Sequence, residues 1–260
     1  MKMNIFKHVA VLTLIIIIFS GCSLNQQYYS NITRKNESLD ILKKIESINR
    51  DVKTSKGTGW ITITDKKKQS KKFRMAWAAS FPDKIRLTLL SAGHPVETIL
   101  ADGKSVTLIS HTGKHKTKKI NSANPSLRDV VAIPVTIQDI LSIFAGQVPI
   151  SKFDTAQIAQ ISSSSQLTDT MLILKRRWNG YSQNIVLTSD NRVASFSLLN
   201  DNRRLVHSVF NEHYKEIDSF SIPVKVKIRD NEGRVIDFEM TAYQPNIEVK
   251  PDIFVLTESR

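Results

Sequence analysis

The stretch Lys71-Lys72-Phe73-Arg74-Met75-Ala76-Trp77 decides the fold, because its apolar and polar residues alternate with the period of a β-strand. Phe73, Met75 and Trp77 fall on one face, and the charged Arg74 falls on the other. Strands with a single apolar face are typical of antiparallel sheets that cover a core on one side and meet water on the other. The sequence therefore predicts an antiparallel sheet around this strand.

The residues on both sides of this stretch predict further strands. Residues 60–63 lead into a polar turn at 66–70, which makes a hairpin with the strand above, and residues 85–89 alternate in the same way. Turn signals such as Asp102-Gly103 recur at short intervals beyond, which favours an antiparallel meander. The remaining predicted strands are residues 98–101, 105–109, 116–120, 171–176, 183–188, 194–199, 205–214, 224–229 and 235–242.

The period becomes helical in two regions. Apolar residues recur every three or four positions over residues 38–52, which predicts one amphipathic helix before the sheet. The period is helical again after Pro125, a residue well suited to the first position of a helix that carries Leu127, Val130 and Val131.

A further helix is predicted just beyond this segment. Thr136 and Asp139 are spaced like a capping box, residues 140–144 are apolar, and Gly146 is suited to end the helix. A long meander interrupted by helices implies a sheet that curves around them. The fold class we expect is α+β: an open, strongly curved antiparallel half-barrel with an N-terminal helix and lid helices over an apolar cavity.

The N-terminus predicts export and lipidation. Basic residues precede an apolar run at 9–19, and the small pair Ser20-Gly21 stands directly before Cys22. This order describes a secretory signal over residues 1–21, and the apolar run is too short to span a bilayer. A cysteine at this place is what a lipoprotein signal requires, so we expect cleavage between Gly21 and Cys22 and lipid on Cys22. The alternative is an ordinary secreted protein in which Cys22 is incidental.

The predicted lipoprotein signal is followed by a tether and a single domain. Residues 22–35 are polar and predict a lipidated tether, and residues 36–260 have the length of a single domain. Stable anchoring needs more than one acyl chain, which a lipidated Cys22 supplies. By resemblance to enteric lipoproteins, Ser23 favours the outer membrane, facing the periplasm, over retention at the inner membrane.

The chain is basic, with a formal net charge of +13, and Cys22 is its single cysteine, so no internal disulfide is possible. The expected partners of an exported basic protein are anionic lipid head groups or an acidic protein, and not nucleic acid. The alternative is that the charge only keeps the surface of the protein solvated. The densest run of lysines spans residues 66–72. We interpret it as a soluble hairpin tip in preference to a lipid contact, because no aromatic insertion element stands beside it in the sequence.

Motifs for catalysis, cofactors or metals are missing from the sequence, which contains no phosphate loop, Gly-x-Ser-x-Gly elbow or His-Glu-x-x-His. His111 and His115 flank a turn without a carboxylate or cysteine near them in sequence, so we predict no metal site. We expect a protein that is not an enzyme and that carries no cofactor. Trp60, Phe73 and their neighbours either line a lipid cavity or fill a core.

The order of these elements resembles the family of the outer-membrane lipoprotein receptor LolB and its periplasmic carrier partner. The matching pieces, between about Lys53 and Ile150, are GTGWITI (57–63), FRMAW (73–77), DKIRLTL (83–89), VTLI (106–109), IPV (133–135) and GQVP (146–149). The resemblance implies an open β-barrel with helices forming a lid over an acyl-binding cavity. It implies acyl chains of lipoproteins or lipids as ligands, and a periplasmic carrier protein as a partner.

Residues are carried over from this resemblance as candidates. In the receptor, a loop after the third strand carries an exposed leucine that helps to place cargo in the membrane. The matching stretch here is 91–96, which gives His94, Pro95 and Val96 as membrane-facing candidates. The cavity candidates are Trp60, Phe73, Met75, Trp77, Leu87, Leu89, Ile140 and Phe144.

Two functions remain open from the sequence. The first is a lipid-anchored carrier or receptor that holds acyl chains in the half-barrel for lipoprotein or lipid transfer and outer-membrane insertion, without making or breaking a bond. The second is a structural or sensing lipoprotein that uses the same barrel as a scaffold for binding proteins. Co-purifying lipid would favour the first function, and a stoichiometric protein partner without lipid would favour the second.

Overall fold

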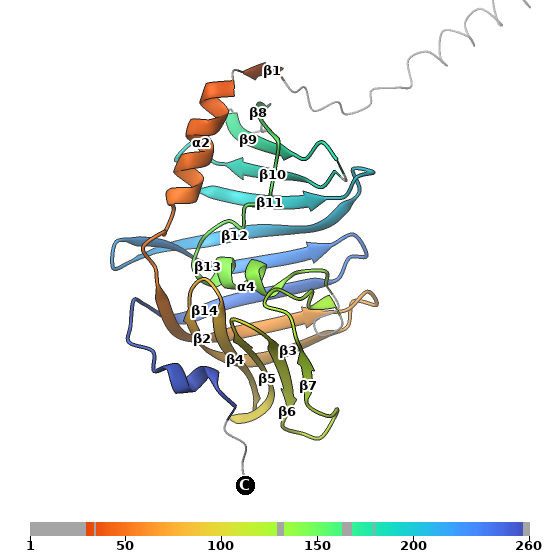
Figure 1. The fold of residues 1–260 in the computed structure, drawn as a ribbon, viewed down its shortest axis with the longest axis vertical. Helices are drawn as coiled ribbons and strands as arrows, with labels where there is room; N and C mark the ends of the chain where they lie inside the picture. The colour runs from red at the N-terminus through yellow and green to blue at the C-terminus, as the bar shows by residue number, and fades with distance from the viewer. Residues whose placement is uncertain (1–29, 34, 129–132, 163–167, 179, 257–260) are drawn as a thin grey trace, which may run out of the picture.

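The structure is a computed structural model that describes residues 30–33, 35–128, 133–162, 168–178 and 180–256. These residues form one antiparallel sheet of 14 strands in the order β1-β8-β9-β10-β11-β12-β13-β14-β2-β3-β4-β5-β6-β7 (Figure 1). The first strands are β1 (Ser30–Thr33), β2 (Thr54–Thr64), β3 (Ser70–Ser80), β4 (Lys84–Ser91), β5 (His94–Asp102), β6 (Val106–Ser110) and β7 (Lys118–Ile120). The later strands are β8 (Thr155–Ser162), β9 (Thr168–Lys175), β10 (Ser182–Leu187), β11 (Val193–Leu199), β12 (Leu205–Ile217), β13 (Phe220–Asp230) and β14 (Val235–Pro245).

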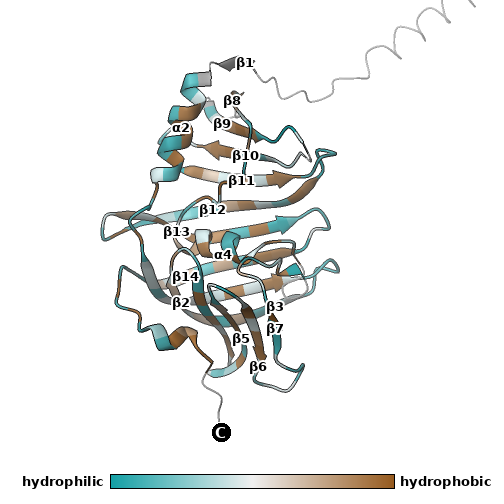
Figure 2. Ribbon diagram, in the orientation of Figure 1, coloured by the Kyte–Doolittle hydropathy of each residue, from teal (hydrophilic) through white to brown (hydrophobic). Residues whose placement is uncertain are grey.

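One face of the sheet is apolar because the strand register aligns the apolar positions of neighbouring strands. A continuous row of paired residues crosses the sheet from β8 to β2, as Figure 2 shows by the alternation of hydrophobic and hydrophilic residues along these strands. The row consists of Ile158, Leu172, Ile185, Phe196, Val209, Ile228, Ile236 and Ile63. A one-residue slip would turn every one of these side chains to the other face, so this row fixes the register.

Within the described residues, two α-helices cover the apolar face. Helix α2 (Lys35–Ser47) lies over β8 and β9 and buries Leu42 and Ile45, whereas α4 (Ile137–Phe144) lies in the middle of the sheet, where β3 to β7 curl around it (Figure 1). The 3-10 helix η1 (Pro251–Phe254) lies against β4 and β5 and buries Phe254. The fold class expected from the sequence, an open, curved half-barrel with helices on its apolar face, is confirmed.

The capping box of α4 is also confirmed, but the first helix is shorter than predicted. It ends at Ser47 and not at residue 52, because Asn49 takes a φ of 51° in the left-handed region, where a right-handed helix cannot continue. Leu127 belongs to no helix in the structure; the residue before it, Ser126, forms an isolated bridge with Thr136. The predicted helical residues Val130 and Val131 lie outside the described residues.

Two strands were not predicted. Strand β8 lies in a region for which the sequence predicted neither helix nor strand, and β1 pairs with it through Ser30 and Gln160 and through Thr33 and Ile158. Part of the segment that we predicted to be a tether therefore belongs to the sheet, and α2 begins at Lys35. Residues 1–29, with Cys22 and the predicted signal, lie outside the described residues.

Candidate functional site

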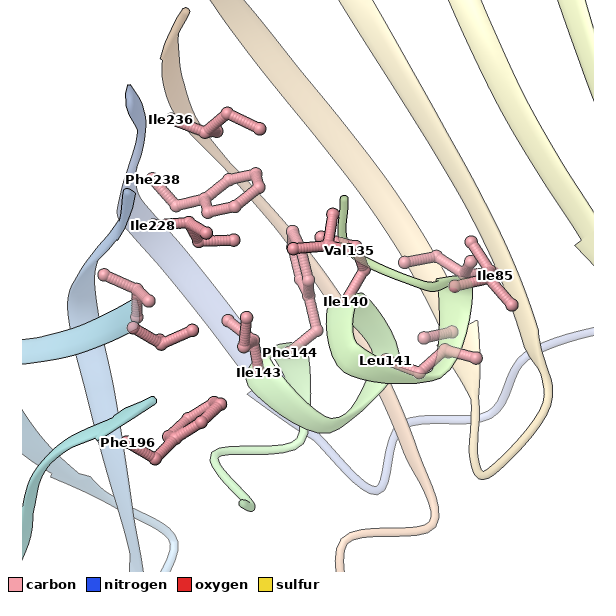
Figure 3. Packing of buried hydrophobic residues seen from close by; sticks show 14 of the residues in the cluster. Ile85, Val135, Ile140, Leu141, Ile143, Phe144, Phe196, Ile228, Ile236 and Phe238 are labelled. Carbon is pink, nitrogen blue, oxygen red and sulfur yellow. The ribbon is translucent and has the colours of Figure 1, made fainter. Parts of the chain in front are cut away.

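Helix α4 is the element around which the candidate site is built. Thr136 Oγ1 accepts from the backbone N–H of Asp139 at 3.2 Å, and Asp139 Oδ2 accepts from the backbone N–H of Thr136 at 2.7 Å. This reciprocal pair satisfies backbone donors that the first turn of a helix leaves free. The helix buries Ile137, Ile140, Leu141, Ile143 and Phe144, so most of its surface faces the sheet (Figure 3).

The C-terminal end of α4 is fixed to the sheet by hydrogen bonds. Tyr243 Oη donates to the carbonyl of Phe144 at 2.8 Å, and Asn49 Nδ2 donates to the carbonyls of Gly146 at 3.0 Å and Ser221 at 2.8 Å. Gly146 has a φ of 66°, and a Cβ there would come within 2.5 Å of Asn49 Nδ2. Only glycine therefore fits between the end of the helix and this amide.

The space beneath α4 is filled by aromatic rings. The ring centroids of Trp77 and Phe144 are 4.9 Å apart, and those of Phe144 and Phe238 are 5.5 Å apart, both edge to face. Trp77 Nε1 donates to Ser55 Oγ at 3.1 Å, so the one polar atom of the indole is satisfied. These residues are packed as a core and leave no room for a ligand.

A small closed cavity lies beside these rings, under the N-terminal half of α4. Its volume is about 30 Å³, which is the space of one water molecule, and its wall is entirely apolar. The wall includes Leu87 and Leu89 from β4, Ile99 from β5 and Ile140 from α4. An acyl chain does not fit in this space unless α4 moves.

A larger open cleft adjoins this cavity. It has a volume of about 600 Å³, within the range of small-molecule sites, and it is bounded by β2 to β7. Ile63, Leu89 and Ile99 line both spaces, so one layer of side chains separates the cleft from the interior. The apolar floor of the cleft consists of Ile63, Phe73, Leu89, Val96, Ile99 and Leu108.

The rim of the cleft is basic. Lys114, Lys116 and Lys118, from the β6–β7 hairpin, surround its mouth together with His115. His115 Nε2 lies 2.9 Å from Glu97 Oε1, and its Nδ1 lies 2.8 Å from the carbonyl oxygen of Lys116. The pKa of His115 is raised, first by the hydrogen bond with this carbonyl and then by Glu97, which favours a positive charge at the rim.

The structure separates the predicted cavity residues into groups. Phe73 and Leu89 line the open cleft; Leu87, Leu89 and Ile140 line the closed cavity; and Met75, Trp77 and Phe144 lie in the packed core. Trp60 is on the opposite face of the sheet, because it pairs with Arg74 and not with Phe73. Its ring lies 4.8 Å from Lys72 Nζ and 5.9 Å from the Arg74 guanidinium.

The predicted membrane-facing residues are also divided. Val96 lines the cleft, whereas His94 and Pro95 are exposed at the start of β5, beside the tight turn at Ala92 and Gly93. The floor residues Ile63, Ile99 and Leu108 were not among the candidates, because the sequence did not show which face of each strand lines the cavity. The basic rim was missed because its lysines belong to a short hairpin with no apolar pattern.

The two turn histidines have separate partners. His111 Nε2 lies 2.9 Å from Thr98 Oγ1, whereas His115 is held by Glu97. In the part of the chain that the structure describes, no three His, Cys, Asp or Glu side chains are close enough to hold a metal ion. No helix within the described ranges has the length and apolar character needed to cross a membrane.

Solved structures share this arrangement of sheet and helices. A LolA superfamily protein from Nitrosomonas europaea superposes with a TM-score of 0.59 at 14% identity, over 84% of this chain and 97% of the other. The chain has a LolA-like fold. A DUF1329 family protein from Desulfovibrio piger has a TM-score of 0.60 at 8% identity, over 85% of this chain and 97% of the other.

A third structure with the LolA-like fold is a Vibrio parahaemolyticus domain described as that of an outer membrane lipoprotein-sorting protein. It has a TM-score of 0.59 at 11% identity, over 85% of this chain and 97% of the other. The sequence matches no family model, and no curated protein matches it. At these identities the likeness shows the fold alone.

Proposed function

We propose that this protein binds an acyl chain of a lipid or lipoprotein in the open cleft and transfers it, without making or breaking a bond. The observation that carries this proposal is the cleft of about 600 Å³, with a floor of six apolar side chains that faces solvent. Burying a methylene group there contributes about 0.8 kcal/mol, so several methylenes bind without any strong polar contact. The basic rim favours a ligand whose head group is anionic.

We place the protein in the bacterial cell envelope, anchored to the outer membrane through a lipidated Cys22 and facing the periplasm. The export signal in the sequence supports this location, and the lipoprotein-sorting protein among the structures of the same fold agrees with it. A periplasmic carrier that hands over its cargo is the expected partner. The closed cavity under α4 is where an acyl chain would extend if the helix moved, because Ile63, Leu89 and Ile99 line both spaces.

Native mass spectrometry of the purified chain tests this proposal. The wild type is expected to retain lipid, and Phe73→Gln is expected to lose it, because the substitution puts an amide on the apolar floor. Phe210→Gln is the matched control: Phe210 is 40% exposed on β12 and does not line the cleft, so this variant is expected to keep its lipid. Absence of lipid from the wild type, or equal loss from both variants, would refute the proposal.

A further inference from the structure

Several hairpins of this sheet turn at the same ends of the strands, and we call each of the two sides formed by these strand ends an edge. Because neighbouring strands are antiparallel, successive hairpins alternate between the two edges. The hairpins after β2, β9, β11 and β13 all turn on the right in Figure 1, and those after β4 and β6 share this edge by the same parity. Four of these hairpins carry an excess of basic residues, and we call them the basic edge: residues 65–69, 111–117, 176–178 with 180–181, and 200–204.

The β9–β10 hairpin presents an aromatic side chain to solvent at this edge. Trp178 is 83% exposed and Tyr181 is 52% exposed. The hairpin is closed by the backbone N–H of Arg176, which donates to the carbonyl of Tyr181 at 3.3 Å, and the backbone N–H of Arg177 donates to Asp154 Oδ2 at 2.6 Å. The indole is therefore carried just beyond β9, directly after two arginines, and most of it faces solvent.

Positive charge is concentrated on the same edge, and the tips of its hairpins are hydrophilic in Figure 2. The tips carry paired or tripled basic residues that exceed the acidic ones: Lys66, Lys67, Lys68, Lys114, Lys116, Arg176, Arg177, Arg203 and Arg204. Four hairpins on the opposite edge each include an aspartate that offsets the basic residues beside it: Asp83, Asp102, Asp190 and Asp218. The β13–β14 hairpin on the first edge is acidic, with Asp230 and Glu232 beside Arg234, but the four basic tips outweigh it, so the two edges differ in charge.

We infer that the basic edge docks on an anionic bilayer surface, with Trp178 inserted at the level of the lipid head groups. Trp and Tyr are preferred at the interface between bilayer and water, and lysines and arginines beside them are attracted to anionic lipids. A flat anionic surface meets several separate basic tips at once, which a small acidic ligand does not. Four strands, β11 to β14, separate the hairpin of Trp178 from that of Lys66-Lys67-Lys68, so the edge supplies an aromatic insertion element that does not stand beside this run.

Docking through the basic edge would also fix the position of the cleft relative to the bilayer. The lining residues Lys114 and Lys116 belong to the basic edge, so docking there would bring this part of the cleft to the bilayer surface. The inference goes beyond the proposed function and does not depend on it, because docking uses hairpin tips and acyl binding uses the apolar floor. Phe73→Gln is accordingly expected to leave docking unchanged.

Quenching of tryptophan fluorescence by brominated lipid tests the docking. The full chain is reconstituted in vesicles of phosphatidylglycerol and brominated phosphatidylcholine, and the wild type is compared with Trp178→Phe. An N-terminal anchor holds both proteins at the vesicle equally, so the difference between them reports the position of Trp178. We expect wild-type fluorescence to be quenched more strongly, and the difference to decrease in high salt.

A charge variant and its matched control complete the test. Lys66→Gln, Lys67→Gln and Arg177→Gln together are expected to abolish the quenching difference, since each lost charge weakens docking roughly fivefold. Lys104→Gln, Lys215→Gln and Lys250→Gln remove the same charge from the opposite edge and are expected to preserve it. Equal quenching of wild type and Trp178→Phe, or equal effects of the two charge variants, would overturn the inference.

Discussion

Ile140→Ala tests whether α4 is a packed element of the core or a loosely held lid. Ile140 is 5% exposed and lines the closed cavity of about 30 Å³. The substitution removes three carbon atoms, which contribute about 2.4 kcal/mol at about 0.8 kcal/mol each. The enlarged cavity adds a further cost of about 24 cal/mol per Å³, so we expect the free energy of unfolding to fall by about 3–4 kcal/mol.

Urea unfolding followed by tryptophan fluorescence measures this change, with the slope of the transition compared between variants. Leu39→Ala on α2 is the control, because Leu39 is 36% exposed, and its truncation is expected to cost less than about 1 kcal/mol. A loss below about 1 kcal/mol for Ile140→Ala, equal to the control, would refute a packed interior beneath α4. The variant is also expected to bind short alkanes, because its larger cavity stays apolar.

Three further predictions concern single residues. Tyr243→Phe is expected to lower the free energy of unfolding by about 1–3 kcal/mol, because the carbonyl of Phe144 loses its donor in a buried place, and the midpoint of urea unfolding measures it. The pKa of His207 is lowered by burial from its ordinary value of 6.5, with Asp139 opposing, so the unfolded state takes up the proton more readily. The free energy of unfolding is therefore expected to fall as the pH drops below about 6.5, and to fall less steeply in His207→Gln; identical pH profiles for the two proteins would contradict this prediction. Cys22→Ser is expected to abolish incorporation of labelled palmitate in cells, and a wild type that carries no label would exclude lipidation.

Local patterns predicted the elements whose residues interact with near neighbours. The alternation of Phe73, Met75 and Trp77 was sufficient because the pleat of a strand sends them to one face wherever the strand lies. The capping box of Thr136 and Asp139 was predictable because both partners are three residues apart. Strand β8 was missed because small and polar residues fill much of it, and β1 was missed because backbone pairing with β8 holds it.

Features that depend on distant pairing were not predictable in the same way. Trp60 was grouped with Phe73 because both are aromatic, whereas the register pairs it with Arg74 and turns it to the other face. The cleft brings Ile63 of β2 and the β6–β7 hairpin to one space although three strands separate β2 from β6 in the sheet, and no pattern in residues 111–117 indicates this. Trp178 shares an edge with Lys66 only through the parity of the strands between them, which follows once every strand has been identified.

The position of β2 between β3 and β14 has a consequence for how the chain folds. Ser55, near the start of β2, pairs with Pro245. Asn49 donates to the carbonyl of Ser221, which lies 172 residues further along the chain. Such non-local contacts slow folding, because a long loop must close before they form. Strand β2 therefore cannot complete its pairing until almost the whole chain has been synthesised, and until then part of the apolar face of the N-terminal strands stays uncovered.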